Sequence, residues 1–304
     1  MPILGTAASQ NTKSFLTPPG PTGKFVALSS GTTAASSTNG ITWAARTIPN
    51  EDWKGVTYGA DKFVAVAASW GIASSTDGIT WTARTPPSNS QWTAVAYGNG
   101  VFAAVSSYSS QAASSTNGIT WTARTMPAEP LWWAMAYGNG VFVVVSNYST
   151  ISATSTNGIT WTQRAMPDQY WGAITYGGGK FVAVSYSYDT TVYSTNGINW
   201  TQTSTPPSGP LWSITYGNGV FVAVGDLPGT PTPSAVSTDG ITWSSGTMPN
   251  NDYWRGASFG NGVFIAITAV NYTTAAASST NGITWTLRTL PTASNSWRVT
   301  AFGG

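Results

Sequence analysis

Residues 155–161 read Ser155-Thr156-Asn157-Gly158-Ile159-Thr160-Trp161, and this heptapeptide is one of seven closely similar copies along the 304-residue chain. The copies begin with Ser-Thr, carry Asn or Asp before the glycine, and close with a tryptophan. These tryptophans are Trp43, Trp81, Trp121, Trp161, Trp200, Trp243 and Trp285. Their spacing of 38 to 43 residues indicates an architecture built from seven repeats.

Each repeat reads as four short strands separated by turns. Residues 132–137 form an apolar, aromatic run, and the Asn-Gly turn that follows favours a tight hairpin into the β-branched run 141–146. Residues 151–155 and 159–164 are two further strands, joined by the turn of the heptapeptide. Seven such repeats predict an all-β fold, a seven-bladed β-propeller of four-stranded antiparallel blades.

The two ends of the repeat region are complementary. Residues 24–29 resemble a second strand with no first strand before it, and residues 297–303 resemble a first strand with nothing after it. We therefore expect the C-terminal strand to close the ring by joining the N-terminal blade. The predicted organisation is an N-terminal arm of residues 1–22 and a propeller of residues 23–304.

Composition excludes several classes of partner. Charged residues make up 7% of the chain, against about 25% in ordinary domains, and the net charge is +2. Nucleic acids and anionic membranes both need clustered Lys and Arg, so neither is an expected partner. The chain has no cysteine and no histidine. We expect no metal and no cofactor, because the repeated turns offer a single Asp or Asn each.

The copies Ser75-Thr76-Asp77-Gly78-Ile79-Thr80-Trp81 and 237–243 resemble the Asp-box (BNR) repeat of sialidase-like propellers. The resemblance implies a hairpin turn whose tryptophan fills the space between blades. Sialidases hold a carboxylate with three arginines, and an arginine follows the heptapeptide tryptophan in five copies. These are Arg46, Arg84, Arg124, Arg164 and Arg288. We interpret them as guards of an outer edge strand, whereas Arg255 and Arg298 open first strands near the central face.

Aromatic residues gather in the loops of one face. Each first strand opens with a tryptophan or leucine that we expect in the core, with Trp133 and Trp212 as extra tryptophans beside them. The loop residues are better candidates for binding, since aromatic rings stack on sugars and carboxylates bind hydroxyl groups. The candidate ligand-binding residues are Trp70, Tyr108, Tyr148, Tyr186, Tyr188, Tyr272, Asp168 and Asp252.

Catalysis is not expected, although the sequence leaves one route to it. A glycosidase needs two carboxylates about 5–10 Å apart. Five acidic residues lie in the predicted blade-to-blade loops of the same face, so such a pair is geometrically possible. They are Glu51, Asp52, Glu129, Asp168 and Asp252. No catalytic residue is assigned.

The opening residues 1–9, Met-Pro-Ile-Leu-Gly-Thr-Ala-Ala-Ser, resemble the start of tail-fibre and other virion proteins of bacteriophages. The resemblance implies a non-enzymatic virion protein, a tail fibre, spike or capsid decoration. Its propeller would attach to host-surface glycans or contact other subunits, and its arm would bind other virion proteins. The expected location is the virion, and we expect no secretory signal. A secreted, multivalent carbohydrate-binding lectin is the alternative, followed by a sialidase-like glycosidase.

Overall fold

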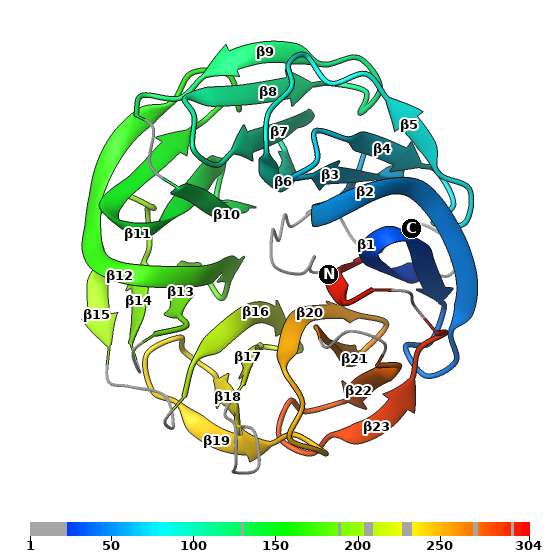
Figure 1. Cartoon of the computed structure of the whole chain (residues 1–304). Coiled ribbons are helices and arrows are strands. Elements are labelled where there is room, and N and C mark those ends of the chain that lie inside the picture. Colours follow the sequence, from blue (N-terminus) through cyan, green and yellow to red (C-terminus); the bar gives the residue numbers. More distant parts are fainter. Residues whose placement is uncertain are drawn as a thin grey trace, which may run out of the picture.

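The computed structural model describes residues 23–128, 131–187, 190–203, 209–226, 233–269, 273–292 and 295–304. Within these ranges every regular element is a β-strand, and the sheets stand radially around a common axis (Figure 1). The predicted arm of residues 1–22 and three residues singled out above, Glu129, Tyr188 and Tyr272, lie outside the described part of the chain.

Hydrogen bonding joins the strands into five antiparallel sheets. Three sheets have four strands each: β6 (Trp92–Gly98), β7 (Val101–Ser106), β8 (Gln111–Ser115) and β9 (Thr122–Thr125); β16 (Leu211–Gly217), β17 (Val220–Gly225), β18 (Pro233–Ser237) and β19 (Ser244–Thr247); β20 (Trp254–Gly260), β21 (Val263–Thr268), β22 (Ala275–Ser279) and β23 (Thr286–Thr289). Two sheets have six: β24 (Trp297–Gly303), β1 (Lys24–Ser37), β2 (Ala44–Gly59), β3 (Lys62–Ala67), β4 (Ile72–Ser75) and β5 (Thr82–Arg84); β10 (Leu131–Gly138), β11 (Val141–Ser155), β12 (Thr162–Gly177), β13 (Lys180–Ser185), β14 (Thr191–Ser194) and β15 (Thr201–Thr203).

The prediction of seven four-stranded blades is wrong, because the structure has five blades. The seven sequence repeats are distributed over five sheets, since β2 and β12 run unbroken from one repeat into the next over 16 residues each. A loop was expected there. Instead Glu51 and Asp52 stay paired with Gly31 and Ser30, across a register shift. A strand that bends at an irregularity rather than ending in a loop merges two repeats into one sheet.

The predicted closure of the ring is confirmed. β24 pairs antiparallel with β1, from Lys24 opposite Gly303 to Ser29 opposite Trp297. A second series of contacts supports the closure. We call the strand of each repeat that lies nearest the axis its inner strand; these strands are β2, β6, β10, β12, β16, β20 and β24. The glycine at the end of each inner strand lies against an aromatic ring of the next repeat. The pairs are Gly59–Tyr97, Gly98–Tyr137, Gly138–Tyr176, Gly177–Tyr216, Gly217–Phe259, Gly260–Phe302 and Gly303–Tyr58. The C-terminal strand therefore completes both the hydrogen bonding and this series of packing contacts.

The heptapeptides form side-chain-capped turns. Asn157 Oδ1 accepts hydrogen bonds from the N–H groups of Ile159 and Thr160, both at 2.9 Å, and Ser155 Oγ accepts one from the N–H of Gly158 at 2.9 Å. The same three bonds recur in the other six copies. Asp and Asn are interchangeable there because both present the accepting oxygen.

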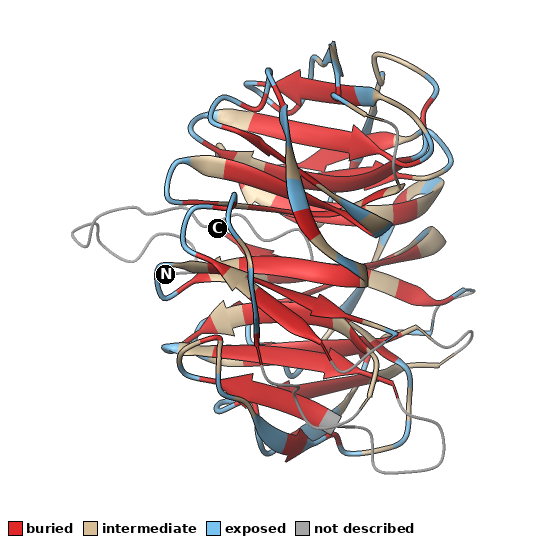
Figure 2. Ribbon diagram, turned by 90° about the vertical axis from the view of Figure 1, so that its left-hand side faces the viewer, coloured by how far each residue is buried: buried red, intermediate tan, exposed pale blue. Residues whose placement is uncertain are grey.

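Tryptophans occupy the core, as the sequence predicts. Four of the heptapeptide tryptophans pack beside phenylalanines of second strands, with ring centroids 6.2–6.4 Å apart: Trp43, Trp81, Trp121 and Trp161. The tryptophans that open the first strands are fully buried: Trp53, Trp92, Trp132, Trp171, Trp254 and Trp297. Figure 2 shows that burial runs along the strands and that exposed residues gather at turns and loops. Ligand contact must therefore involve other residues.

Candidate functional site

Each inner strand carries a β-bulge directly after a buried residue, which is a tryptophan in six strands and Leu211 in the seventh. In β2 the register passes from Trp53 to Gly55 and leaves Lys54 without a partner in the ladder. The same shift occurs on the other six inner strands. We call the seven bulged residues the channel ring: Lys54, Thr93, Trp133, Gly172, Trp212, Arg255 and Arg298. A bulge re-aims a side chain, and bulges are common beside functional sites.

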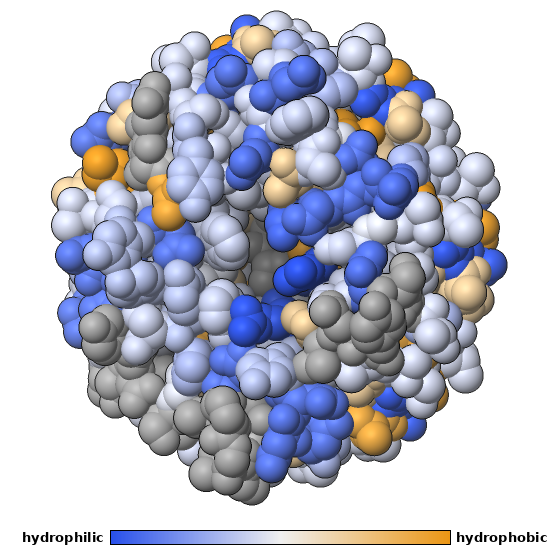
Figure 3. Space-filling view, in the orientation of Figure 1, coloured by the Kyte–Doolittle hydropathy of each residue, from blue (hydrophilic) through white to orange (hydrophobic). Residues whose placement is uncertain are grey.

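The channel ring surrounds one cavity. All seven of its residues line a hollow of ≈ 250 Å³, together with Ala134, Ala269 and Val299. Figure 3 shows a central depression bordered by strongly hydrophilic atoms. Its volume lies just below the roughly 300–1,000 Å³ that is usual for sites of drug-sized ligands. The cavity therefore suits a small group, such as one ring with a polar substituent, rather than an extended ligand.

The channel ring has two chemically different sides. Its three cations, Lys54, Arg255 and Arg298, lie on β2, β20 and β24, which are consecutive neighbours around the axis. Both of its tryptophans, Trp133 and Trp212, lie on β10 and β16, outside this cationic arc. One small cavity thus combines concentrated positive charge with indole rings.

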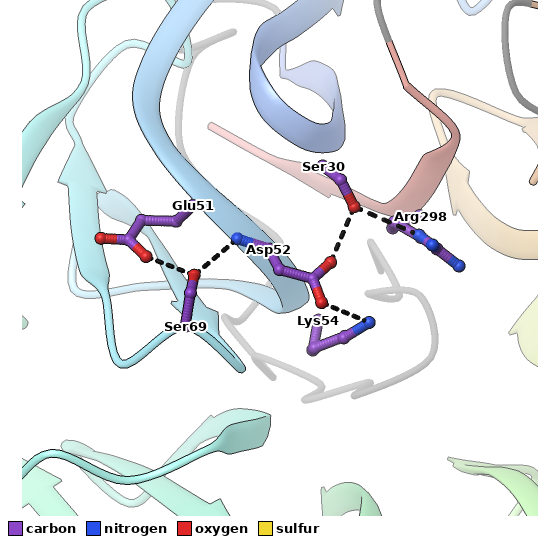
Figure 4. Close-up of polar contacts among 6 residues, drawn as sticks. All are labelled: Ser30, Glu51, Asp52, Lys54, Ser69 and Arg298. Carbon is purple, nitrogen blue, oxygen red and sulfur yellow. Dashed lines mark hydrogen bonds and ion pairs between the residues drawn. The ribbon is translucent and has the colours of Figure 1, made fainter.

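Asp52 organises one end of the cationic arc (Figure 4). Its carboxylate pairs with Lys54 Nζ at 2.9 Å and accepts a hydrogen bond from Ser30 Oγ at 2.7 Å. Burial would raise the pKa of Asp52, but the hydrogen bonds from Lys54 and Ser30 and the charges of Lys54 and Arg298 outweigh it and hold the pKa below its ordinary value. Asp52 therefore stays ionised and positions Lys54, which is the opposite of what a general acid needs.

Asp226 organises the other end of the arc. Its buried carboxylate accepts hydrogen bonds from Arg255, at 2.6 Å from Nη2 and 3.1 Å from Nε, and from Trp212 Nε1 at 2.7 Å. The Arg255 guanidinium lies 3.6 Å from the centre of the Trp212 ring, and Tyr186 stacks on Trp212 at 4.0 Å with an interplanar angle of 9°. Two groups this close to one ring must occupy opposite faces, so Trp212 is a support with no face left for a ligand.

Arg298, in the middle of the arc, differs from its neighbours. Its Nε donates to Ser30 Oγ at 3.4 Å, and within the described residues no carboxylate forms an ion pair with it. Its side chain is half-buried and lines the cavity. Toward the described residues, most of its five donor N–H groups make no hydrogen bond, and these groups can meet a ligand.

Three of the predicted loop aromatics are held in an unusual backbone conformation. Trp70, Tyr108 and Tyr148 have φ values of 80°, 57° and 63°, and their side chains are 53%, 72% and 65% exposed. Tyr108 and Tyr148 occupy the position of Gly31 in the first repeat, where φ is 93°. Bulky residues avoid this left-handed region, and strained positions of this kind concentrate at functional sites. The chain therefore places exposed rings where glycine would cost less.

The structure brings two of the predicted aromatics into one cluster. Tyr148 and Tyr186 both contact Tyr170, with ring centroids at 4.7 and 5.6 Å. Tyr186 donates its hydroxyl hydrogen to Asn147 Oδ1 at 2.8 Å and stacks on Trp212. A continuous aromatic path therefore leads from the exposed Tyr148 to the channel ring. Tyr170 was not among the candidate residues predicted from the sequence.

The predicted acids do not join this cluster. Asp168 is exposed, and the carboxylate of Asp252 accepts a hydrogen bond from Asn250 at 2.5 Å. No group of three acidic residues that could hold a metal occurs among the described residues. The same part of the chain contains no helix able to cross a membrane. Tyr188 and Tyr272 lie outside the described residues.

The five repeated arginines lie on outer-strand segments, as predicted. Each donates from Nε to a hydroxyl of the adjacent strand at 2.8–3.0 Å: Arg46 to Ser36, Arg84 to Ser74, Arg124 to Ser114, Arg164 to Thr154 and Arg288 to Ser278. They are distant in the fold from the channel ring and contribute nothing to it. From the sequence, four residues of the channel ring were noted only singly: Arg255, Arg298, Trp133 and Trp212. The signal that would have grouped them is the variable position that follows each nearly invariant tryptophan.

Comparison with solved structures places the fold. A streptogramin B lyase superposes with a TM-score of 0.72 at 14% identity, covering 82% of this chain and 86% of the other; virginiamycin B lyase from Staphylococcus aureus gives 0.70 at 13%, covering 80% and 86%. The chain is a β-propeller. YCF48 bound to D1 peptide is also similar, with a TM-score of 0.62 at 14% identity over 90% and 96%. At such identities the likeness is one of fold alone. No protein-family model and no curated protein matches the sequence.

Proposed function

We propose that this propeller is a non-enzymatic attachment protein that binds carbohydrate with the loop face around its channel. The observation that carries the proposal is the set of exposed aromatic rings, Trp70, Tyr108 and Tyr148, at backbone positions that favour glycine. An exposed ring held at an energetic cost is poorly explained by stability. It is well suited to stacking on the apolar face of a sugar.

The charged groups support binding rather than catalysis. Asp52 and Asp226 are each engaged by a cation and a further donor, so both serve to position neighbouring side chains. A glycosidase would need one carboxyl group with a raised pKa, and the pKa of Asp52 is lowered instead. The lyases of similar fold are enzymes, but identities of 13–14% carry no residue of theirs onto this chain.

The proposed location is a phage virion, with the propeller displayed on a tail fibre, spike or capsid. Support comes from the N-terminal resemblance, the low charge and the lack of cysteine and histidine. These features suit a particle surface that needs neither a reducing environment nor a metal. The protein should co-purify with particles at a fixed stoichiometry. Its absence from purified particles would favour the secreted lectin.

A glycan array with the purified protein tests the binding function. We expect binding that Tyr148→Ala weakens several-fold, since an aromatic contact contributes about 0.5–1.5 kcal/mol beyond its buried area. The matched control is Tyr253→Ala, a tyrosine that is 43% exposed with ordinary backbone geometry. A blank array, or equal losses in both variants, would overturn the proposal.

A further inference from the structure

We infer that the channel ring binds the carboxylate of an acidic sugar, with Arg298 as its principal contact. This inference rests on the proposed carbohydrate-binding function and adds the class of sugar. It starts from the cavity of ≈ 250 Å³ that all seven bulged residues line. Six repeats share a buried tryptophan and the seventh has Leu211, whereas the residue that follows is of five different types, so the scaffold is kept while the cavity chemistry varies.

Charge in the arc favours a single anionic group. Lys54 and Arg255 already pair with Asp52 and Asp226, at 2.9 and 2.6 Å, which fixes their positions and offsets their charge. Arg298 lacks such a partner among the described residues and therefore carries the surplus positive charge. A guanidinium binds a carboxylate through two parallel hydrogen bonds, a geometry that a lysine ammonium cannot reproduce.

The apolar part of the cavity favours a ring rather than a free anion. Trp133 is half-buried and lines the cavity with Ala134, Ala269 and Val299. Trp212 is covered by Tyr186 and Arg255, so Trp133 is the indole that remains for stacking. A pyranose ring bearing a carboxylate presents an apolar face and an anionic edge, which matches both sides of the channel ring.

Hydrogen bonds hold Ser30, the neighbour of Arg298, in place. Ser30, which accepts the hydrogen bond of Arg298, donates its own Oγ hydrogen to Asp52, and its backbone N–H donates to the Ser296 carbonyl at 3.1 Å. Figure 4 shows Arg298 of β24 meeting Ser30 and Lys54 of β2 meeting Asp52, and the hydrogen bond between Ser30 and Asp52 joins the two cations. A preorganised cationic site loses less entropy on binding, which strengthens recognition of a small anionic group.

Calorimetric titration with galacturonate and with its methyl ester tests the inference, because esterification removes the charge of the carboxyl group and adds only one methyl group. We expect the free acid to bind at least about tenfold more tightly than the ester, since charged hydrogen bonds contribute about 1.5–3 kcal/mol. Arg298→Gln should abolish this preference. Arg288→Gln, on the outer strand, is the matched control and should keep it. Rising salt should weaken binding of the acid.

Each outcome separates the inference from the proposed function. Equal binding of acid and ester would overturn the inference and leave carbohydrate binding standing. Binding of acetate or inorganic phosphate without either saccharide would overturn the inference, because the channel ring would then be a general anion site, and the glycan array would still decide the proposed function. Retention of the preference in Arg298→Gln, with an unchanged unfolding midpoint, would show that the anion binds elsewhere.

Discussion

The heptapeptide turns and the channel ring each have seven members. The turns repeat the same side-chain contacts, whereas the channel ring repeats only a backbone geometry. Every turn makes the same three hydrogen bonds, and its Asn or Asp is exposed in six copies and half-buried at Asp239. The channel ring keeps one backbone geometry but presents Lys, Thr, Trp, Gly, Trp, Arg and Arg. We infer that the repeated side chains build the scaffold, whereas the repeated bulge supplies positions at which side chains can differ.

The largest effect should come from breaking the ring itself. Truncation before Ser296 removes β24, which leaves the edge of β1 unpaired and exposes the core around Leu28 and Phe25. We expect an insoluble or unfolded product, because an open apolar edge aggregates. Circular dichroism and size-exclusion chromatography check this. A soluble truncated monomer with an unchanged melting curve would contradict the role of closure.

Breaking a single heptapeptide turn should cost less stability and should leave the channel ring unchanged. Asn157→Ala removes the acceptor of two backbone hydrogen bonds, each worth about 0.5–1.5 kcal/mol. We expect a loss of about 1–2 kcal/mol of stability in chemical unfolding. Asn157→Asp is the control, since the chain itself uses Asp77 and Asp239 at this position. Equal destabilisation by both variants would mean that the acceptor is not what matters.

Replacing a strained aromatic residue should raise stability, whereas the two preceding changes lower it. Tyr108→Gly should stabilise the protein by about 0.5 kcal/mol, because relief of the left-handed φ exceeds the entropy that glycine adds to the unfolded chain. The same change should weaken glycan binding. Tyr253→Gly, at an ordinary φ, should destabilise instead. If Tyr108→Gly lowers the unfolding midpoint, the tyrosine is structural and the functional interpretation of its strain is wrong.

The smallest expected effect is a shift in unfolding at acid pH. Burial would raise the pKa of Asp77, but hydrogen bonds from the N–H groups of Thr80 and Ile79 and from Ser75, with the charge of Lys24, hold it below 3.8. Its stabilisation is complete above the unfolded value of 3.8 and is lost as pH falls through the lower folded value. Asp77→Asn should match the natural protein at pH 7 and unfold slightly later on acid titration. Identical acid midpoints would refute this contribution.

Features that depend on local sequence rules could be predicted from the sequence. Asn-Gly turns, β-branched runs and recurrent tryptophans specify strands, caps and core, and the unpaired strand at each end specifies the closure by β24. The number of sheets was not predictable, because it depends on whether residues such as Glu51 and Asp52 leave the ladder or stay paired. Tyr148 and Tyr186 were predicted as loop aromatics, but Tyr148 lies within β11 and Tyr186 directly follows β13. Their shared contact with Tyr170 of β12 depends on how these strands meet in space.

The channel ring was not predicted as a set, for a similar reason. A single strand does not show that Lys54, Arg255 and Arg298 share one cavity, since they are far apart in sequence. Only the bulge, which depends on pairing with the neighbouring strand, turns these side chains toward the axis. Repeat alignment could have shown the variable position, but not the cavity that it lines.

Parallel measurement of stability and ligand affinity in Arg298→Gln and Asn157→Ala tests the division between scaffold and site most directly. We expect Arg298→Gln to unfold at the natural midpoint and to lose at least about tenfold in affinity for an acidic sugar. Asn157→Ala should unfold at a lower midpoint and bind with natural affinity below that midpoint. Natural affinity in Arg298→Gln, or lost affinity in folded Asn157→Ala, would contradict the account.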